Sequence, residues 1–157
     1  MIHFKKQRIY IDTSVIGGYF DDEFMEATLL LFEKFRTGEF ILVYSEVIEE
    51  ELFEAPDKVR ELIQNLPKAN VEYIELTDEA IILANSYISE NVVGKTSRND
   101  CLHIAIATIS NVDILVSWNF KHIVNIKRIR GYNAINMLNG YPSVEIRSPL
   151  EILSYEE

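Results

Sequence analysis

The sequence predicts an α/β protein in which a mostly parallel central sheet is flanked by helices. Short runs of β-branched and aromatic residues alternate with segments whose apolar residues recur at helical spacing. The connections between them are short, and several of the runs end in a hydroxyl or a carboxylate. This alternation is typical of strands that run in one direction, with helices covering both faces of the sheet.

Each expected element follows from its own residues. The strands are β-branched or aromatic runs, expected over residues 8–11, 40–44, 71–76, 113–117 and 144–146. Alternating polar and apolar residues place the third of them at an edge of the sheet. The helices are expected over residues 15–20, 26–37, 46–54, 57–65, 77–90, 99–110 and 127–138. Gly38 ends the second helix, and Ser45 is expected to cap the third.

Length and composition favour one domain over residues 1–157. In a chain of 157 residues, a hydrophobic content of 48% is enough for a full core. The one cysteine, Cys101, excludes an internal disulfide and is expected to fill apolar space. No apolar run is long enough to span a membrane and the N-terminus lacks a signal-peptide core, so a cytoplasmic protein is expected.

The net charge of −10 argues against broad, non-specific binding to nucleic acids. The acidic excess lies largely between residues 21 and 90, whereas basic residues gather near both ends. They are Lys5, Lys6 and Arg8 at the start, and Lys121, His122, Lys127, Arg128 and Arg130 late in the chain. These clusters are either a basic rim around an acidic pocket or a solvated face.

Asp12, Thr13 and Ser14 follow directly on the first strand. Ligands of parallel α/β sheets bind at the carboxyl ends of the strands, so Asp12 is the first candidate for chemistry. All three residue types are also good helix caps, and one of them is enough for that purpose. With three in a row, Thr13 or Ser14 is expected to take the capping role and leave Asp12 free for a ligand.

Two further acids are expected at the same edge of the sheet. Glu51 borders the buried stripe of its helix, with Glu50 in reserve because a small rotation would exchange them. Asp100 opens an almost wholly apolar helix, where the helix dipole alone also favours an acid. His103 shares its face, although a histidine there is more often a packed core residue. Asp113 begins its strand, so it is expected at the opposite edge and is excluded.

Four segments together resemble the motifs of the PIN-domain family, in that family's order. They are residues 9–16 (IYIDTSVI), 45–52 (SEVIEEEL), 99–105 (NDCLHIA) and 113–123 (DILVSWNFKHI). The resemblance spans almost the whole chain, including residues 140–149, and points to VapC-like toxins of type II toxin–antitoxin pairs. It implies a three-layer α/β/α PIN-like fold and a metal-dependent endoribonuclease that hydrolyses RNA phosphodiester bonds.

The resemblance places the family's acidic quartet on Asp12, Glu51, Asp100 and the turn position Asn119. Asn119 is an amide where an acid is usual, so a second metal ion is less expected, although an amide carbonyl can still bind a hard cation. Mg²⁺ or Mn²⁺ suits these oxygen ligands, and the first three residues are the expected metal ligands. With no Cys or His cluster, zinc is not expected.

Further residues and partners complete this interpretation. Hydroxyls are expected to hold the carboxylates in place, from Thr13, Ser14 and Ser117. Basic residues on two loops are expected to contact RNA phosphates or, equally, to be solvated surface: Lys95, Arg98, Lys121 and His122. The resemblance also implies a homodimer that a small antitoxin protein holds inactive.

Two other functions account for fewer of the residues. A PIN-like binding or regulatory module with weakened catalysis would explain the amide at Asn119, and it predicts no metal-stimulated cleavage. A small-molecule phosphatase with Asp12 as nucleophile would need a paired acid and a lysine, which the sequence does not place convincingly. Covalent trapping of phosphate on Asp12 would distinguish that third function.

Overall fold

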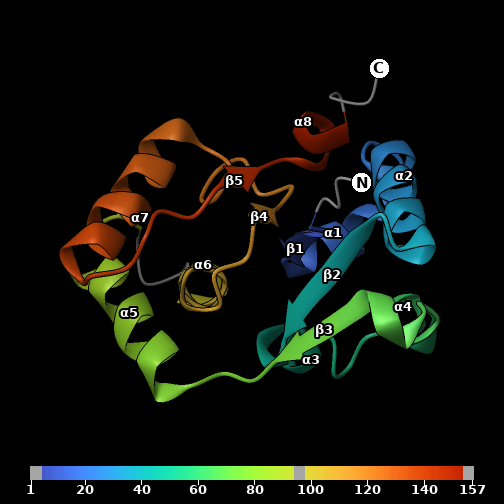
Figure 1. Ribbon diagram of the computed structural model, residues 1–157, viewed down its shortest axis with the longest axis horizontal. Helices are drawn as coiled ribbons and strands as arrows, with labels where there is room; N and C mark the ends of the chain where they lie inside the picture. The colour runs from blue at the N-terminus through green and yellow to red at the C-terminus, as the bar shows by residue number, and fades with distance from the viewer. Residues whose placement is uncertain (1–4, 94–97, 154–157) are drawn as a thin grey trace.

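The computed structural model describes residues 5–93 and 98–153. Strands and helices alternate along most of it, as Figure 1 shows. In order they are β1 (Gln7–Ile11), α1 (Thr13–Gly18), α2 (Met25–Thr37), β2 (Phe40–Ser45), α3 (Glu46–Glu51), α4 (Asp57–Gln64), η1 (Lys68–Asn70), β3 (Val71–Ile74), α5 (Asp78–Ser89), α6 (Arg98–Ile109), β4 (Ile114–Val116), α7 (Ile126–Leu138), β5 (Ile146–Arg147) and α8 (Pro149–Leu153). Across these described ranges, none of the helices has the length and apolar character needed to cross a membrane.

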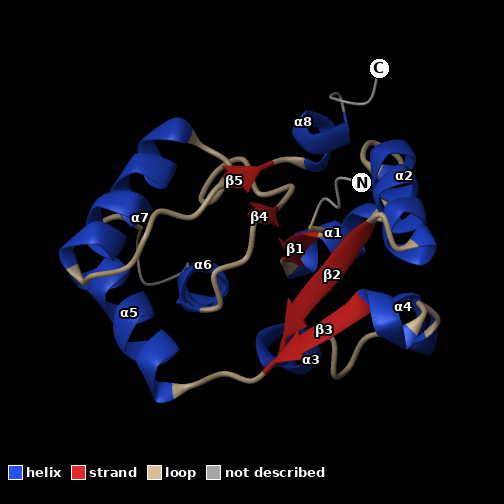
Figure 2. Cartoon of the chain, in the orientation of Figure 1, coloured by secondary structure: helices blue, strands red, loops and turns tan. Residues whose placement is uncertain are grey.

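The described strands form one sheet in the order β3-β2-β1-β4-β5, and every neighbouring pair is parallel. β1 is central, with Tyr10 opposite Val43 of β2 and Leu115 of β4. β3 lies at an edge, as its alternating sequence predicts (Figure 2). Because the strands run the same way, the segments after β1, β2 and β4 come together where the strands end, which is the carboxyl edge of the sheet.

Apolar side chains on the two faces of the sheet form two separate clusters. Tyr10 points into one with α5, α6 and α7, whereas Ile9 and Ile11 point into the other with α1, α2, α4 and α8. The two groups of helices lie on opposite sides of the sheet in Figure 1. This is the predicted three-layer α/β/α arrangement, and successive residues of β1 serve both layers because side chains of a strand alternate.

The ends of several elements differ from the sequence-based expectations. α3 ends at Glu51 instead of residue 54, and β3 ends at Ile74 instead of residue 76. The last strand is two residues long and begins at Ile146, and the short helix α8 was not predicted. Gly38 ends α2 as expected, with a left-handed φ of 81°.

Two adjacent glycines in α1 give a first prediction about stability. A Cβ at Gly18 would lie 2.6 Å from Nε1 of Trp118 and 2.8 Å from Oγ1 of Thr28, whereas Gly17 faces open space. The Trp118 ring cannot easily move away because it is stacked on Phe24 with ring centroids 4.3 Å apart. Gly18→Ala is therefore expected to destabilise the protein by about 1–3 kcal/mol.

Gly17→Ala is the matched control, because an alanine in a helix is favoured over glycine by roughly 0.5–1 kcal/mol. Urea denaturation of both variants should move the midpoint in opposite directions. Equal effects of the two substitutions would contradict the packing of Gly18 against Trp118.

Candidate active site

Asp12 is held from both sides by serine hydroxyls. It follows β1 and is only 3% exposed. Ser14 Oγ donates to Asp12 Oδ1 over 2.6 Å, and Ser117 Oγ, which follows β4, donates to Oδ2 over 2.6 Å. Each carboxylate oxygen of Asp12 thus has a hydroxyl donor from a different segment of the chain.

The backbone of the turn after β4 holds the hydroxyls of both serines in place. The backbone N–H of Trp118 donates to Ser14 Oγ over 2.8 Å, and that of Asn119 donates to Ser117 Oγ over 2.9 Å. A hydroxyl that accepts a backbone N–H keeps its own hydrogen for the carboxylate. The turn therefore sets the orientation of the Asp12 carboxylate through two serines.

The capping of the two helices at this edge differs from the expectation. Asp12 itself is the N-cap of α1, and its Oδ1 accepts the N–H of Val15 over 3.4 Å, so neither Thr13 nor Ser14 takes over that role. Ser45 occupies the N-cap position of α3, but its side chain makes no capping hydrogen bond. Its hydroxyl contacts the hydroxyl of Tyr10 instead, at 2.7 Å.

Glu51, and not Glu50, reaches the site. Its Oε1 accepts hydrogen bonds of 2.9 Å from Oγ1 of Thr13 and 2.9 Å from Nε2 of His103. Glu50 is exposed to solvent on the neighbouring position of α3. Glu51 ends α3, and its side chain is 27% exposed. The three hydroxyls of Thr13, Ser14 and Ser117 thus each donate to a carboxylate.

Asp100 and Asn119 are joined by a hydrogen bond of 3.2 Å from Nδ2 of the amide to Oδ2 of the acid. The amide oxygen is turned the other way, because Oδ1 accepts the backbone N–H of His122 over 3.0 Å. In this structure the Asn119 carbonyl oxygen is therefore held by the backbone of the same turn. Asn119 presents its N–H donor to the Asp100 carboxylate.

The three acids differ in their protonation preference. Burial raises the pKa of Asp12, and His103, Ser117 and Ser14 offset only part of that effect. Burial also raises the pKa of Asp100, and the nearby Asp12 carboxylate raises it further. For Glu51 burial acts in the same direction, but hydrogen bonding and charge from His103, with the Thr13 hydroxyl, outweigh it and lower the pKa. Such divergence among neighbouring carboxyls is typical of functional sites.

The donor chemistry at this edge suits a hard cation, since Mg²⁺ and Mn²⁺ prefer oxygen ligands such as carboxylates, carbonyls and water. In residues 5–93 and 98–153, however, no three His, Cys, Asp or Glu side chains are gathered closely enough to hold a metal ion. The charges of Asp12 and Glu51 both raise the pKa of Asp100.

The basic residues are arranged unevenly around the site. Lys121 is exposed beside the turn, and His122 is partly buried, with no hydrogen-bond partner for Nδ1 among the described residues. Arg98 opens α6 and donates to Oδ1 of Asn85 over 3.3 Å, while Lys95 lies outside the described residues. Arg8 lies at the other edge of the sheet, where it pairs with Glu72.

Asp113 also lies at that opposite edge, as predicted. Its Oδ2 accepts the backbone N–H of Arg8 over 2.7 Å at the start of β1. Cys101 is buried in the cluster beneath α5 and α7, and burial raises the pKa of its thiol to about 12. It fills apolar space and is not a nucleophile at neutral pH.

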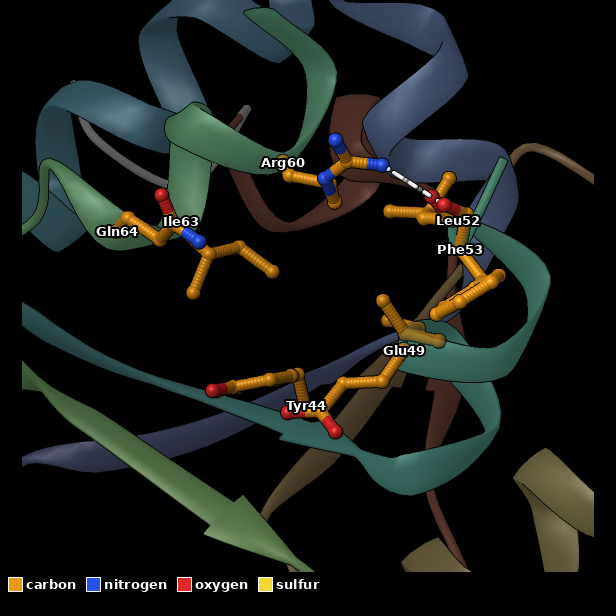
Figure 3. Close-up of a pocket in the computed structure, with 8 residues that line it drawn as sticks. Tyr44, Glu49, Leu52, Phe53, Arg60, Ile63 and Gln64 are labelled. Atoms are coloured by element: carbon orange, nitrogen blue, oxygen red, sulfur yellow. Dashed lines mark hydrogen bonds between the residues drawn. The ribbon is translucent and has the colours of Figure 1, made fainter. Parts of the chain in front are cut away.

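A cavity of about 530 Å³ lies between α3 and α4, and none of Asp12, Glu51 and Asp100 lines it. It is mainly apolar, and Figure 3 shows its lining side chains from β2, α3 and α4. At its rim Arg60 Nη1 donates to the carbonyl oxygens of Phe53 and Ala55, each over 2.8 Å. Arg60 thereby fixes the turn after α3, and with it the end of the helix that carries Glu51.

Sequence reasoning missed two residues of this site. His103 was interpreted as a core residue, and Tyr10 as strand packing, yet His103 Nδ1 lies 2.6 Å from the Tyr10 hydroxyl and its Nε2 contacts Glu51. The available signal was the spacing of Asp100 and His103, which places both on one face of α6. No sequence pattern indicated Tyr10.

The sequence matches no family profile and no curated protein. The fold, however, is found in solved structures. A chain of VapBC2 from Rickettsia felis, bound to a DNA fragment from their promoter, is similar with a TM-score of 0.57 and 14% identity, over 90% of this chain and 98% of that one. VapC20 of Mycobacterium tuberculosis, a Sarcin-Ricin loop cleaving toxin, is similar with a TM-score of 0.56 and 12% identity, over 87% and 98%.

A chain of FitAB bound to the IR36 DNA fragment shows the same likeness, with a TM-score of 0.57 and 11% identity over 90% of this chain and 94% of that one. At such low identity the likeness is one of fold. Each comparison extends over nearly the full length of both chains. The four sequence motifs are likewise spread over most of this chain. The chain therefore has the three-layer α/β/α fold of these VapBC2, VapC20 and FitAB chains.

Proposed function

We propose that this protein is a metal-dependent endoribonuclease, the toxin component of a toxin–antitoxin pair. The observation that carries the proposal is that Asp12 after β1, Glu51 at the end of α3 and Asp100 at the start of α6 all lie at the carboxyl edge of the sheet. The shared fold with a toxin that cleaves the Sarcin-Ricin loop supports RNA as substrate. The site is open to solvent at Glu51, as a long polymer substrate requires.

In this proposal Asp12 and Asp100 are the main ligands of Mg²⁺ or Mn²⁺, and Glu51 completes the set or orients the attacking water. The ion supplies positive charge opposite the scissile phosphate when it is bound. Glu51 is ionised, since hydrogen bonds from His103 and Thr13 lower its pKa, so its carboxylate can accept a hydrogen bond from the attacking water and orient it. Ser14 and Ser117 hold the Asp12 carboxylate so that it does not rotate away.

The acidic protein needs local cations to bind an RNA strand. Lys121 and His122 lie beside the turn that carries Asn119, and Arg98 lies two residues before Asp100. We assign these three, together with Lys95, to the phosphates on either side of the cleaved bond. A small antitoxin that covers the site, a homodimer and a cytoplasmic location complete the proposal, and the VapBC2 and FitAB complexes support the antitoxin.

Glu51 and Glu50 provide a sharp test, because they are adjacent on α3 and only Glu51 contacts Thr13 and His103. Glu51→Gln is expected to reduce Mn²⁺-stimulated cleavage of RNA by at least about 100-fold, since several kcal/mol of transition-state stabilisation is lost. Glu50→Gln should cleave like the unmodified protein. Cleavage that survives both chelation with EDTA and the Glu51→Gln substitution would sink the proposal.

A second function is favoured by the amide at position 119. Because Asn119 donates to Asp100, the two groups satisfy each other without a cation. A binding or regulatory module with weakened catalysis would have this arrangement. It would bind RNA or a protein partner with no metal-stimulated cleavage and no thermal shift on addition of Mn²⁺, so the same assay separates the two functions.

A further inference from the structure

A row of hydrogen-bonded polar side chains runs through the core and ends at Glu51. The hydroxyl of Ser45 lies 2.7 Å from the Tyr10 hydroxyl, which lies 2.6 Å from Nδ1 of His103. Nε2 of His103 then lies 2.9 Å from Oε1 of Glu51. This row of side chains joins β2, β1, α6 and α3, and it leads from the middle of the sheet to the acidic cluster.

All three inner members are removed from water. Tyr10 and Ser45 are fully buried and His103 is 2% exposed. Burying polar groups costs free energy that apolar residues of similar shape would not cost. Ser45 even forgoes a capping hydrogen bond on α3 to take part. A contribution to stability alone therefore does not explain why this row of polar side chains is buried. Glu51 is the only one of its four members that reaches the surface.

The hydrogen bond between His103 and Glu51 has a defined donor. An ionised carboxylate only accepts hydrogen bonds, so Nε2 of His103 carries the hydrogen that it shares with Glu51. The other ring nitrogen, Nδ1, is hydrogen-bonded to the Tyr10 hydroxyl. Because both ring nitrogens have a partner, the orientation of the His103 ring is fixed.

Both hydrogen bonds to Glu51 fall on the same oxygen. Thr13 and His103 each donate to Oε1, and Oε2 accepts none from the described part of the chain. Oε1 is thus occupied from the protein side and Oε2 is left for the reaction. This division fixes the orientation of the carboxylate about its last torsion, which is otherwise soft for glutamate.

We propose that Tyr10 and His103 are positioning residues, which hold the Glu51 carboxylate from the core side with Oε2 directed at the substrate. The inference rests on the proposed ribonuclease function and assigns roles to two residues that the acidic quartet does not include. Neither residue touches the RNA. Outer partners of this kind typically contribute about 10–100-fold to activity or metal affinity.

Tyr10→Phe tests this proposal, and Tyr87→Phe is its matched control. Tyr87 is likewise fully buried in the same apolar cluster, and its hydroxyl donates to Oδ1 of Asn136, away from the acids. Tyr10→Phe should reduce kcat about 10-fold or more with KM for RNA unchanged, whereas Tyr87→Phe should leave kcat as it is. In a Glu51→Gln background, Tyr10→Phe should cause no further loss.

A second measurement does not require cleavage. The ¹³C carboxyl resonance of Glu51, in the metal-free protein without RNA, should shift in Tyr10→Phe and in His103→Gln and remain in place in Tyr87→Phe. If the ¹³C chemical shift of Glu51 is unchanged in Tyr10→Phe, the positioning role is overturned, whether or not the protein cleaves RNA. Equal losses of kcat in the two tyrosine variants would do the same, whereas an unmodified protein without activity would refute only the ribonuclease function.

Discussion

Replacing Asp12 by Asn is expected to abolish RNA cleavage and at the same time to stabilise the folded protein. Cleavage should fall by at least about 100-fold, because in the proposed ribonuclease the central carboxylate would supply several kcal/mol of transition-state stabilisation by holding the cation. Stability should rise because burial raises the pKa of Asp12 above its unfolded value of 3.8. The neutral amide removes the cost of burying that charge, and Ser14 and Ser117 can still hydrogen-bond to it.

The sign of the pH dependence follows from this raised pKa. Between the unfolded and folded pKa values the native state binds more protons, so stability falls as the pH rises through that interval, and the loss is complete above it. The gain in melting temperature of Asp12→Asn should therefore be larger at pH 7 than near pH 4. Asp113→Asn, at the opposite edge of the sheet, is the control and should leave cleavage unchanged. An Asp12→Asn variant that melts below the unmodified protein at pH 7 would contradict this account.

Asn119→Asp is expected to make the protein dependent on a cation for its stability. The amide hydrogen bond to Asp100 becomes a contact between two carboxylates, at a separation of 3.2 Å in the present structure. Two like charges about 4 Å apart repel by roughly 4 kcal/mol at an effective dielectric constant of 20, an upper limit that protonation of one acid relieves. The metal-free variant should melt below the unmodified protein at pH 7.

Millimolar Mn²⁺ should restore that loss, with a larger rise in melting temperature than it causes in the unmodified protein. Asn125→Asp is a suitable control, because Asn125 caps α7 and an aspartate there remains a good cap. It should show no added response to Mn²⁺. If Asn119→Asp and Asn125→Asp respond alike, position 119 does not face the cation site.

The fold could be predicted because its signals are local. β1, β2 and β4 are apolar runs that end in Asp12, Ser45 and Ser117, and parallel pairing brings those ends to one edge whatever the details of packing. Helix ends were less accurate. α3 stops at Glu51 because the following turn is held by Arg60, eight residues after Leu52, and such a contact leaves no periodic signal.

Roles that depend on competition between hydrogen-bond partners could not be predicted from sequence. Ser45 is a good cap by residue type, but the buried Tyr10 hydroxyl needs a partner, and Ser45 supplies it. Asp12 acts as cap and as acid together, because its two oxygens face different donors. The direction of the Asn119 amide depends on the backbone N–H of His122, three residues later in the turn. Each outcome is set by contacts between distant or irregular segments.

The separation of the site residues along the chain has a consequence for its synthesis. Asp12 is made before Ser117, whose hydroxyl holds its Oδ2 and which lies 105 residues later in the chain. A nascent chain that ends before β4 also lacks a neighbour of the central strand β1. The hydrogen bonds that orient the Asp12 carboxylate can therefore form only after β4 and the serine that follows it have been made.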